Sequence, residues 1–187
     1  MGKRLSETLH RLANPWVALT GLGLFLLFTA VVLPREAART ERYAGEAGTP
    51  DTSLFYSADE LYEMAEAYGP EGRRLYVRSR LTFDVIWPLV YAFFLISAIS
   101  WVYDRAFSTD SRWRLANLVP ILAAALDFLE NGSAALVMVR YPLRTPVVDT
   151  AAGLFTLLKW ISIAASFVLL SGGFAAYLWR RVRKTAE

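Results

Sequence analysis

The stretch LVPILAAALDFLENGSAALVMV, residues 118–139, is apolar enough to cross a membrane but carries two acids and an amide at its centre. These polar residues are Asp127, Glu130 and Asn131. A charged side chain in the middle of a spanning helix costs about 2.5–3.5 kcal/mol on insertion scales. A chain keeps such groups when they face partners inside a helix bundle, where they often mark a functional site. The stretch therefore predicts a membrane-spanning helix and also the place of a site.

Three further apolar blocks of similar length occur in the chain. A bilayer core about 30 Å thick requires about 20 apolar residues per helix. Of the 187 residues, 55% are apolar, and the mean hydropathy is +0.33. We therefore expect one all-α membrane domain, residues 1–187, built as a four-transmembrane-helix bundle. The predicted spans are about 15–33, 82–103, 115–139 and 150–180.

Residues 34–80 form the one long loop of this arrangement. We expect its first part, up to residue 53, to be irregular, because it is polar and contains Gly and Pro. Short amphipathic helices are expected at about 58–68 and 71–80. Ser57 and Glu60 fit a capping box at the start of the first. The loop is either a connector on the outer membrane surface or a lid over the mouth of the bundle.

The charges indicate an orientation in the membrane. Basic residues precede the first span, lie between the second and third spans, and follow the fourth. The positive-inside rule then places both termini in the cytoplasm. The preference for Arg over Lys is typical of a GC-rich bacterial genome, so the expected location is a bacterial inner membrane. The net charge of +3 gives no reason to expect nucleic acid as a partner; the expected surroundings are the lipid bilayer.

The scarcity of sulfur and imidazole ligands excludes several kinds of chemistry. The chain has no cysteine and one histidine. Disulfide, thiolate-metal and thiol-redox chemistry are therefore excluded. A histidine-based metal site or catalytic triad is not expected either, and the sequence predicts no metal and no other cofactor.

Lys159, in the fourth predicted span, is expected to pair with the acids of the third. A helix rises 1.5 Å per residue. By that rise, Glu130 lies about 13 Å below the outer end of its span and Lys159 about 12 Å below the outer end of its own. Asp127 lies about one turn deeper. Because the depths agree, we predict a Lys159–Glu130 or Lys159–Asp127 ion pair, which would lower the insertion cost and keep the lysine charged.

Other polar and aromatic residues are expected to complete a polar strip between the second, third and fourth spans. The acids and Asn131 recur on one helical face. For Trp160, we favour a role in packing or lipid contact over a role as the cover of a pocket. The predicted ligand-binding or polar-core residues are Asp84, Tyr91, Asp127, Glu130, Asn131, Lys159 and Trp160, with Arg73 and Arg74 as candidates for gating or for neutralising acids.

Three functions fit this strip. The first is a salt-bridge network that only fixes helix packing, as in an accessory subunit of a membrane complex. The second is a site for a small or lipidic ligand that enters from the outer side. The third is a proton- or cation-coupled path in an oligomer. We favour ligand binding, because two acids and one lysine leave a surplus negative charge. If the protein is an enzyme, Asp127 and Glu130 are the candidates for acid–base chemistry on a lipid-like substrate.

Several short motifs resemble a widespread group of bacterial four-helix membrane proteins. In the loop these are Tyr56-Ser57-x-x-Glu60-Leu61-Tyr62 and Tyr68-Gly69-x-x-Gly72-Arg73, and in the spans Asp84-x-x-x-Pro88-x-x-Tyr91, Asp127-x-x-Glu130-Asn131 and Lys159-Trp160. Together they cover roughly residues 50–170. The resemblance brings no activity, substrate or cofactor. It implies that the loop and the polar helix positions form one unit.

Overall fold

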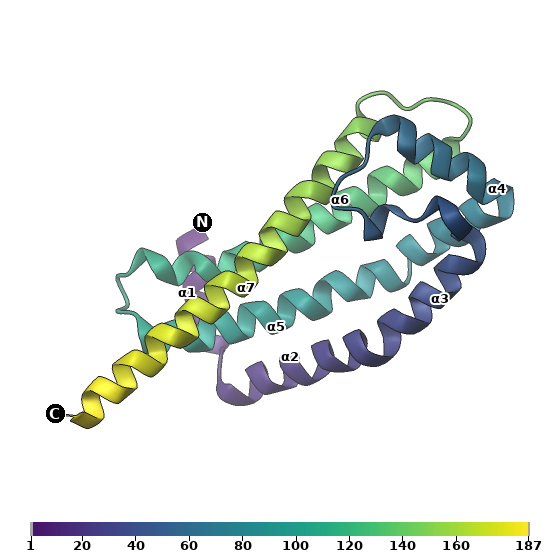
Figure 1. Cartoon of the computed structure of the whole chain (residues 1–187). Coiled ribbons are helices and arrows are strands. Elements are labelled where there is room, and N and C mark those ends of the chain that lie inside the picture. Colours follow the sequence, from purple (N-terminus) through teal and green to yellow (C-terminus); the bar gives the residue numbers. More distant parts are fainter. Residues whose placement is uncertain (1, 187) are drawn as a thin grey trace. The chain divides into compact units, whose positions relative to one another are not determined.

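The computed structural model describes residues 2–186, which form helices and connecting loops and contain no strand. The α-helices (Figure 1) are α1 (Gly2–Leu12), α2 (Pro15–Leu27), α3 (Leu33–Ala44), α4 (Ala58–Arg80), α5 (Phe83–Ala106), α6 (Val119–Arg140) and α7 (Val148–Ala186). The shorter turns are a π-helix at Phe28–Val32 and 3-10 helices at Gly45–Ala47, Pro50–Thr52 and Arg112–Leu118. The predicted all-α class is confirmed.

Four helical stretches within residues 2–186 are long and apolar enough to cross a membrane. Each contains one of the apolar blocks found in the sequence, so the prediction of four such helices is confirmed. The stretches are Pro15–Ala47, Ala58–Ala106, Arg112–Arg140 and Val148–Arg183.

The chain divides into two compact units, and the three longest apolar helices pass from one into the other. Unit 1 contains α1 and α2, the second part of α5, the turns before α6, and the second part of α7. Unit 2 contains α3, α4, the start of α5, most of α6 and the start of α7. The bounds are residues 1–26, 90–123 and 161–187 for unit 1, and 27–89 and 124–160 for unit 2.

The expectation that residues 34–53 are irregular is wrong for residues 34–44, which are helical, whereas residues 45–53 form only two short 3-10 turns and connecting residues. The first apolar helix does not stop near residue 33 but continues through a π-helical turn into α3. Pro34 comes just after this turn. A proline inside a helix removes one backbone donor, and a π-helical turn is one of the local adjustments that accommodate the missing hydrogen bond. Further along, the ring of Tyr43 packs edge-on against Tyr68 of α4, with 5.4 Å between centroids. Tertiary packing on α4 thus keeps a polar segment helical.

The helix α4 begins at the predicted capping box, which the structure confirms. The Glu60 amide donates to the Ser57 hydroxyl at 3.2 Å, and the Ser57 amide donates to the Glu60 carboxylate at 2.7 Å. At Gly69 the backbone leaves the helical region, with φ 62° and ψ 179°. Glycine adopts this conformation without the Cβ clash of other residues. The 23-residue helix α4 therefore has two arms that meet at Gly69.

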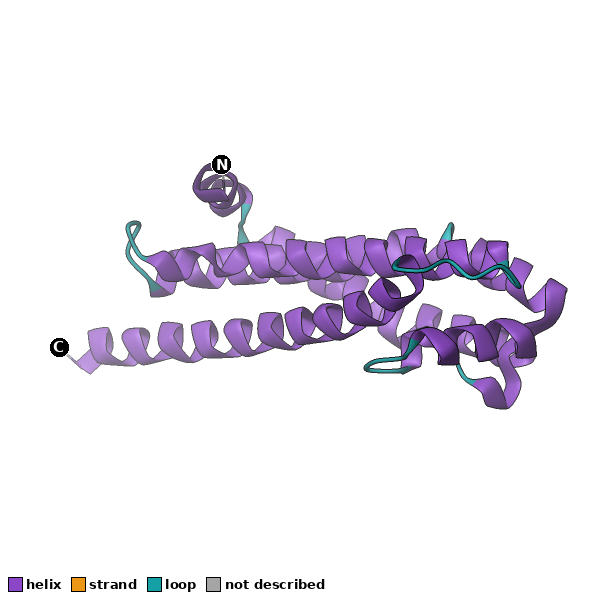
Figure 2. Cartoon of the chain, turned by 90° about the horizontal axis from the view of Figure 1, so that it is seen from above, coloured by secondary structure: helices purple, strands orange, loops and turns teal. Residues whose placement is uncertain are grey.

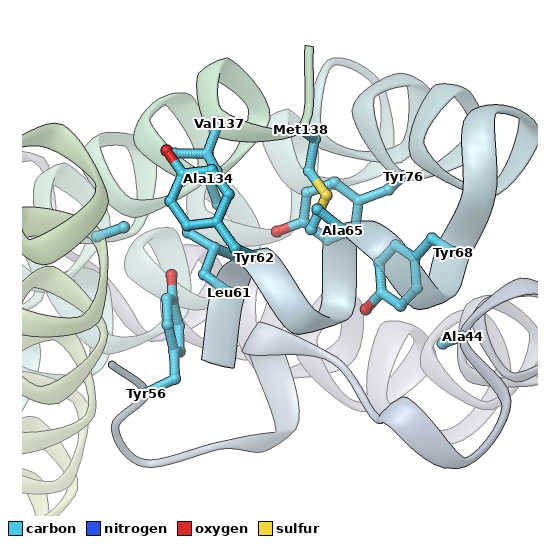
Figure 3. Close-up of a cluster of buried hydrophobic side chains, with 11 residues drawn as sticks. Ala44, Tyr56, Leu61, Tyr62, Ala65, Tyr68, Tyr76, Ala134, Val137 and Met138 are labelled. Carbon is cyan, nitrogen blue, oxygen red and sulfur yellow. The ribbon is translucent and has the colours of Figure 1, made fainter. Parts of the chain in front are cut away.

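The core of unit 2 forms where α4 packs against α6 and α7 (Figure 3). Leu61, Ala65 and Tyr68 lie on one face of the first arm of α4 at helical spacing. Met138 of α6 packs in the same cluster as Tyr76 of the second arm. The buried cluster comprises Ala44, Tyr56, Leu61, Tyr62, Ala65, Tyr68, Tyr76, Ala134, Val137, Met138 and Ala152.

Removing the hydroxyl that caps α4 should weaken the start of this helix. We expect Ser57→Ala to lower the stability of the protein by about 1 kcal/mol, because one backbone donor of the first turn loses its acceptor. Hydrogen–deuterium exchange over residues 58–61 reports the loss as faster exchange. Ser57→Asp, which keeps an acceptor at the cap, is the matched control and should leave the exchange nearly unchanged. Equal exchange in Ser57→Ala and the native protein would contradict the prediction.

The same cap should respond to pH. Hydrogen bonds from the backbone and the hydroxyl of Ser57 lower the pKa of Glu60 from its ordinary value of 4.5. A depressed pKa in the folded state means that the stabilisation is present above the pKa of the unfolded chain and is lost as the pH falls through the folded pKa. We expect the first turn of α4 to fray in acid below that ordinary value, measured as exchange corrected for the intrinsic rate. Glu60→Ala should already be frayed at neutral pH and show little further change.

Unit 1 is held by close helix packing and by polar contacts at α1. At Gly21 of α2, an added Cβ would lie 2.9 Å from the Cα of Phe94 on α5, so the two backbones approach closely because the residue is glycine. The Tyr103 hydroxyl of α5 donates to the carbonyl oxygen of Leu169 on α7 at 2.8 Å. The helix α1 packs against the turn Arg112–Leu118.

Candidate functional site

The polar residues of α6 lie on one buried stripe within unit 2. Asp127, Glu130 and Asn131 are 6%, 1% and 5% exposed, and Ala134 continues the stripe at 0%. The spacing i, i+3, i+4 and i+7 brings these positions to one side of a helix. The apolar residues Phe128, Leu129 and Leu136 lie on the exposed part of the same helix. The helix therefore turns its acids inward and its apolar side chains outward, as the sequence predicts.

Lys159 of α7 supplies a positive charge to this stripe. Its ammonium group forms an ion pair with the Glu130 carboxylate and lies 3.7 Å from Oδ1 of Asp127. The lysine is 4% exposed. Both ion pairs that the sequence predicts are therefore present. Pairing of this kind favours the charged form of each partner and offsets part of the cost of removing it from water.

A second buried cation, Arg80, enters from the end of α4. Its Nε lies 3.1 Å from Oδ2 of Asp84 on α5, and its Nη1 donates to Oδ1 of Asn131 at 2.9 Å. The ring of Tyr76 lies 4.6 Å from the guanidinium carbon. Arg80 is 5% exposed. The planar guanidinium presents several donors at fixed angles, which allows one side chain to serve an acid and an amide on two different helices.

Arg80 is not among the predicted site residues, because the predicted loop extends to residue 80. One signal was present: Arg80 precedes Asp84 by four residues, the spacing at which opposite charges pair on a helix. The chain turns between α4 and α5 at residues 81–82, and the two side chains still lie close enough to form the ion pair. Asp84 thus pairs with a residue close to it in sequence, whereas the contact of Arg80 with Asn131 depends on the tertiary fold.

These contacts form one continuous chain, which we call the ion network. Asn131 is the central bridge: it accepts from Arg80 and its Nδ2 donates to Oδ1 of Asp127 at 2.9 Å. The orientation of the amide follows from these two contacts, since its oxygen meets a donor and its nitrogen meets a carboxylate. From α4 to α7 the members are Ser79, Asp84, Arg80, Asn131, Asp127, Lys159 and Glu130.

The charges of the ion network do not cancel. The described residues that these contacts join include three carboxylates and two cations. With every group ionised, the formal charge is −1. All five side chains are at most 7% exposed. A net charge in such surroundings is expensive, so one further positive charge or proton lowers the free energy of the network.

Trp160 connects the network to the chain segment before α4. Its Nε1 donates to the carbonyl oxygen of Ser53 at 3.1 Å, and its ring lies 5.4 Å from the Lys159 ammonium nitrogen. At Gly153, two turns before Trp160 on α7, a Cβ would collide with the carbonyl oxygen of Tyr56. Residues 53–56 therefore lie directly against α7, and the tryptophan is a packing residue that also faces the lysine.

Arg73 and Arg74, the predicted gating residues, contact other groups. Arg73 donates to the carbonyl oxygen of Ala65 at 2.7 Å and lies over the ring of Tyr141. Arg74 forms an exposed i,i+3 ion pair with Glu71. The structure gives the neutralising role at the network to Arg80. Arg73 instead joins the two arms of α4, which supports the turn at Gly69.

Tyr91, predicted at the mouth of the site, belongs to unit 1. It is 2% exposed and follows Asp84 by seven residues on α5. Asp84 itself belongs to unit 2 and to the ion network. No His, Cys, Asp and Glu side chains within residues 2–186 form a group of three that could hold a metal ion.

A substitution at Gly153 tests the contact between α7 and residues 53–56. We expect Gly153→Ala to displace this segment and break the Trp160–Ser53 hydrogen bond, because the new methyl group would overlap the Tyr56 carbonyl. Overpacking of this kind costs about 1–3 kcal/mol. Proteolysis and hydrogen exchange at residues 53–57 should both accelerate. Gly132→Ala is the matched control on α6, where a Cβ meets nothing within 4 Å; the prediction fails if both variants behave alike.

The fold and the ion network define the class of protein: an all-helical protein with four helical stretches suited to a membrane and a buried ionic centre built from residues of three of them. Comparison of the chain with protein-family models, with curated proteins and with solved structures gave no match.

Proposed function

We propose that this protein binds, at the ion network, a small or lipidic ligand that carries one positive charge. The observation that supports the proposal is the charge balance of the network, with three buried carboxylates against two buried cations. A cationic head group would bring the charge to zero at the place where a net charge is most costly. When no ligand is bound, a proton on one carboxyl serves the same purpose.

The aromatic residues around the network favour a cation over an anion. Tyr76 already faces the guanidinium of Arg80, and Trp160 faces the ammonium of Lys159. Aromatic rings attract cations through their negative faces, and rings of this type recur in sites that recognise quaternary ammonium groups. An apolar tail on the ligand would match the lipid that surrounds a spanning helix bundle.

The segment 53–57 is the proposed entrance. It is held by the Trp160–Ser53 hydrogen bond and by the close approach of Tyr56 to Gly153. Opening requires this hydrogen bond and this backbone contact to break and moves Tyr56 out of the buried cluster, while Ala65 of α4 and Met138 of α6 stay in the core. We propose that this part of the predicted outer loop acts as a lid and that the ligand enters from the outer side of a bacterial inner membrane, with both chain termini in the cytoplasm.

The test compares the native protein with a charge-balanced variant. Glu130→Gln leaves two carboxylates and two cations, so the network becomes neutral and the variant should fold. Native mass spectrometry of the native protein should show a copurifying molecule that Glu130→Gln lacks. As a direct probe, dodecyltrimethylammonium should raise the melting temperature of the native protein but not that of Glu130→Gln. Dodecyl sulfate, with the same tail and the opposite charge, should give no such stabilisation.

Two alternatives give different results in these experiments. A purely structural network, as in an accessory subunit, predicts no copurifying molecule and no difference between the two amphiphiles. Proton coupling is favoured by the unbroken chain of polar contacts from Ser79 to Glu130. It predicts a proton flux in proteoliposomes that Glu130→Gln abolishes. The mass that native mass spectrometry gives for the intact protein also distinguishes a monomer from a homo-oligomer or a larger complex.

A further inference from the structure

The helix α1 has three distinct faces, and only one of them packs against the protein. Ser6 and His10, one turn apart, are buried at 2% and 5% exposure. Leu5 and Leu12 are exposed at 45% and 66% on a second face. The basic residues lie on a third face or at its edges: Lys3, Arg4 and Arg11. In this helix, therefore, polar side chains face the protein and leucines face outward.

The position of α1 within unit 1 matches that of a helix at a membrane surface. Figure 2 shows the helix at the N mark nearly end-on, whereas the helix that ends at the C mark runs across the view. The helix α1 thus crosses the direction of the last part of α7, which belongs to the same unit. After residues 13–14, the first apolar helix begins at Pro15, capped by Asn14, and Trp16 is 77% exposed. Tryptophan in such a position is typical of the boundary between lipid and water.

We infer that α1 is an interfacial helix that binds an anionic lipid surface. The leucines of the second face would enter the boundary of the acyl chains, and the basic residues would meet the head groups. The charges of α1 support an anionic surface over a zwitterionic one, because three basic residues stand against one acid, Glu7. The polar contacts of Ser6 and His10 hold the helix at a fixed angle, so the leucine stripe points in one direction.

The absence of native cysteine allows a clean test with single spin labels on the full chain in lipid nanodiscs. A label at Leu12→Cys should be accessible to oxygen and protected from a water-soluble nickel reagent when the nanodisc contains phosphatidylglycerol. A label at the neighbouring Arg11→Cys should show the reverse. In nanodiscs of phosphatidylcholine alone, the Leu12→Cys label should become several-fold more accessible to nickel. Water exposure of this label in both lipids would overturn the proposal, and equal burial in both would overturn its dependence on lipid charge.

A different observation carries a second inference, which concerns the side chain of His10. Its Nδ1 lies 3.0 Å from the carbonyl oxygen of Ser100 on α5, and its Nε2 lies 3.0 Å from the carbonyl oxygen of Arg114. The geometry points to a clamp, in which one imidazole joins α1 to α5 and to the turn before α6.

A second contact supports the clamp. The Arg114 carbonyl oxygen also accepts from the Ser6 hydroxyl at 3.1 Å. The side chain of Arg114 pairs with Asp104 of α5 at 2.8 Å, which ties the turn before α6 to α5. Two side chains of α1, one turn apart, thus join this helix to two other segments of unit 1.

The test of the clamp is His10→Gln, whose amide cannot reach both carbonyl oxygens from opposite sides as the two ring nitrogens do. This variant should accelerate hydrogen exchange in α1. His10→Gln exchanging no faster than the native protein would overturn the clamp.

Discussion

Replacing Lys159 with Met should destabilise the protein by about 3–5 kcal/mol, the usual cost of removing one partner of a buried ion pair. The methionine fills a similar volume, so the loss reflects charge and not a cavity. Glu130 and Asp127 would remain at 1% and 6% exposure without the ammonium that now contacts both. Thermal or denaturant unfolding in a mild detergent measures the effect.

The double variant shows whether the loss arises from the ion pair. Adding Glu130→Gln to Lys159→Met removes one of the uncompensated charges, so we expect it to recover most of the lost stability. The difference between the double variant and the sum of the single variants gives the coupling energy of the pair. Arg74→Met is the control, because it breaks an exposed pair with Glu71 that contributes about 0–1 kcal/mol. If Lys159→Met proved as stable as Arg74→Met, the ion network would have no energetic role.

Replacing Arg80 with Met should have an effect of similar size, again about 3–5 kcal/mol. The substitution removes the cation beside Asp84 and the donor to Asn131. We also expect Arg80→Lys to be clearly destabilising, since a single ammonium cannot reproduce the two fixed directions of the guanidinium. The measurement is the same unfolding midpoint, with Arg78→Met as the control on the exposed face of α4. That control should change stability by no more than about 0.5 kcal/mol.

Neutralising the acid separates the two roles of Arg80. In Arg80→Met, an added Asp84→Asn should restore part of the stability, because the uncompensated carboxylate is gone. It should not restore the remainder, which belongs to the hydrogen bond with Asn131. Full restoration would mean that the contact with Asn131 contributes nothing, and the ion network would then be two separate pairs.

The bounds of the helices could be predicted from the sequence where local composition decides them. They could not be predicted where tertiary packing decides them. Four apolar blocks and the Ser57–Glu60 cap are local signals, and the structure has both. The polar residues that follow the first apolar block carry no local signal for a helix strong enough to outweigh Pro34. They are helical in α3, where Tyr43 packs on Tyr68 from a distant part of the chain. A contact between residues far apart in sequence leaves no periodic pattern that identifies it.

The sequence by itself determined which residues had to be buried and paired. Charged groups in an apolar span are costly wherever that span lies, so Asp127, Glu130 and Lys159 identify themselves without a structure. The tertiary structure alone decided the partners: the bridge through Asn131, the inclusion of Arg80 and the seating of Ser53 on Trp160. Burial cost depends on the amino acid and its local surroundings, whereas pairing depends on distances of a few ångströms between helices that only the folded chain brings together.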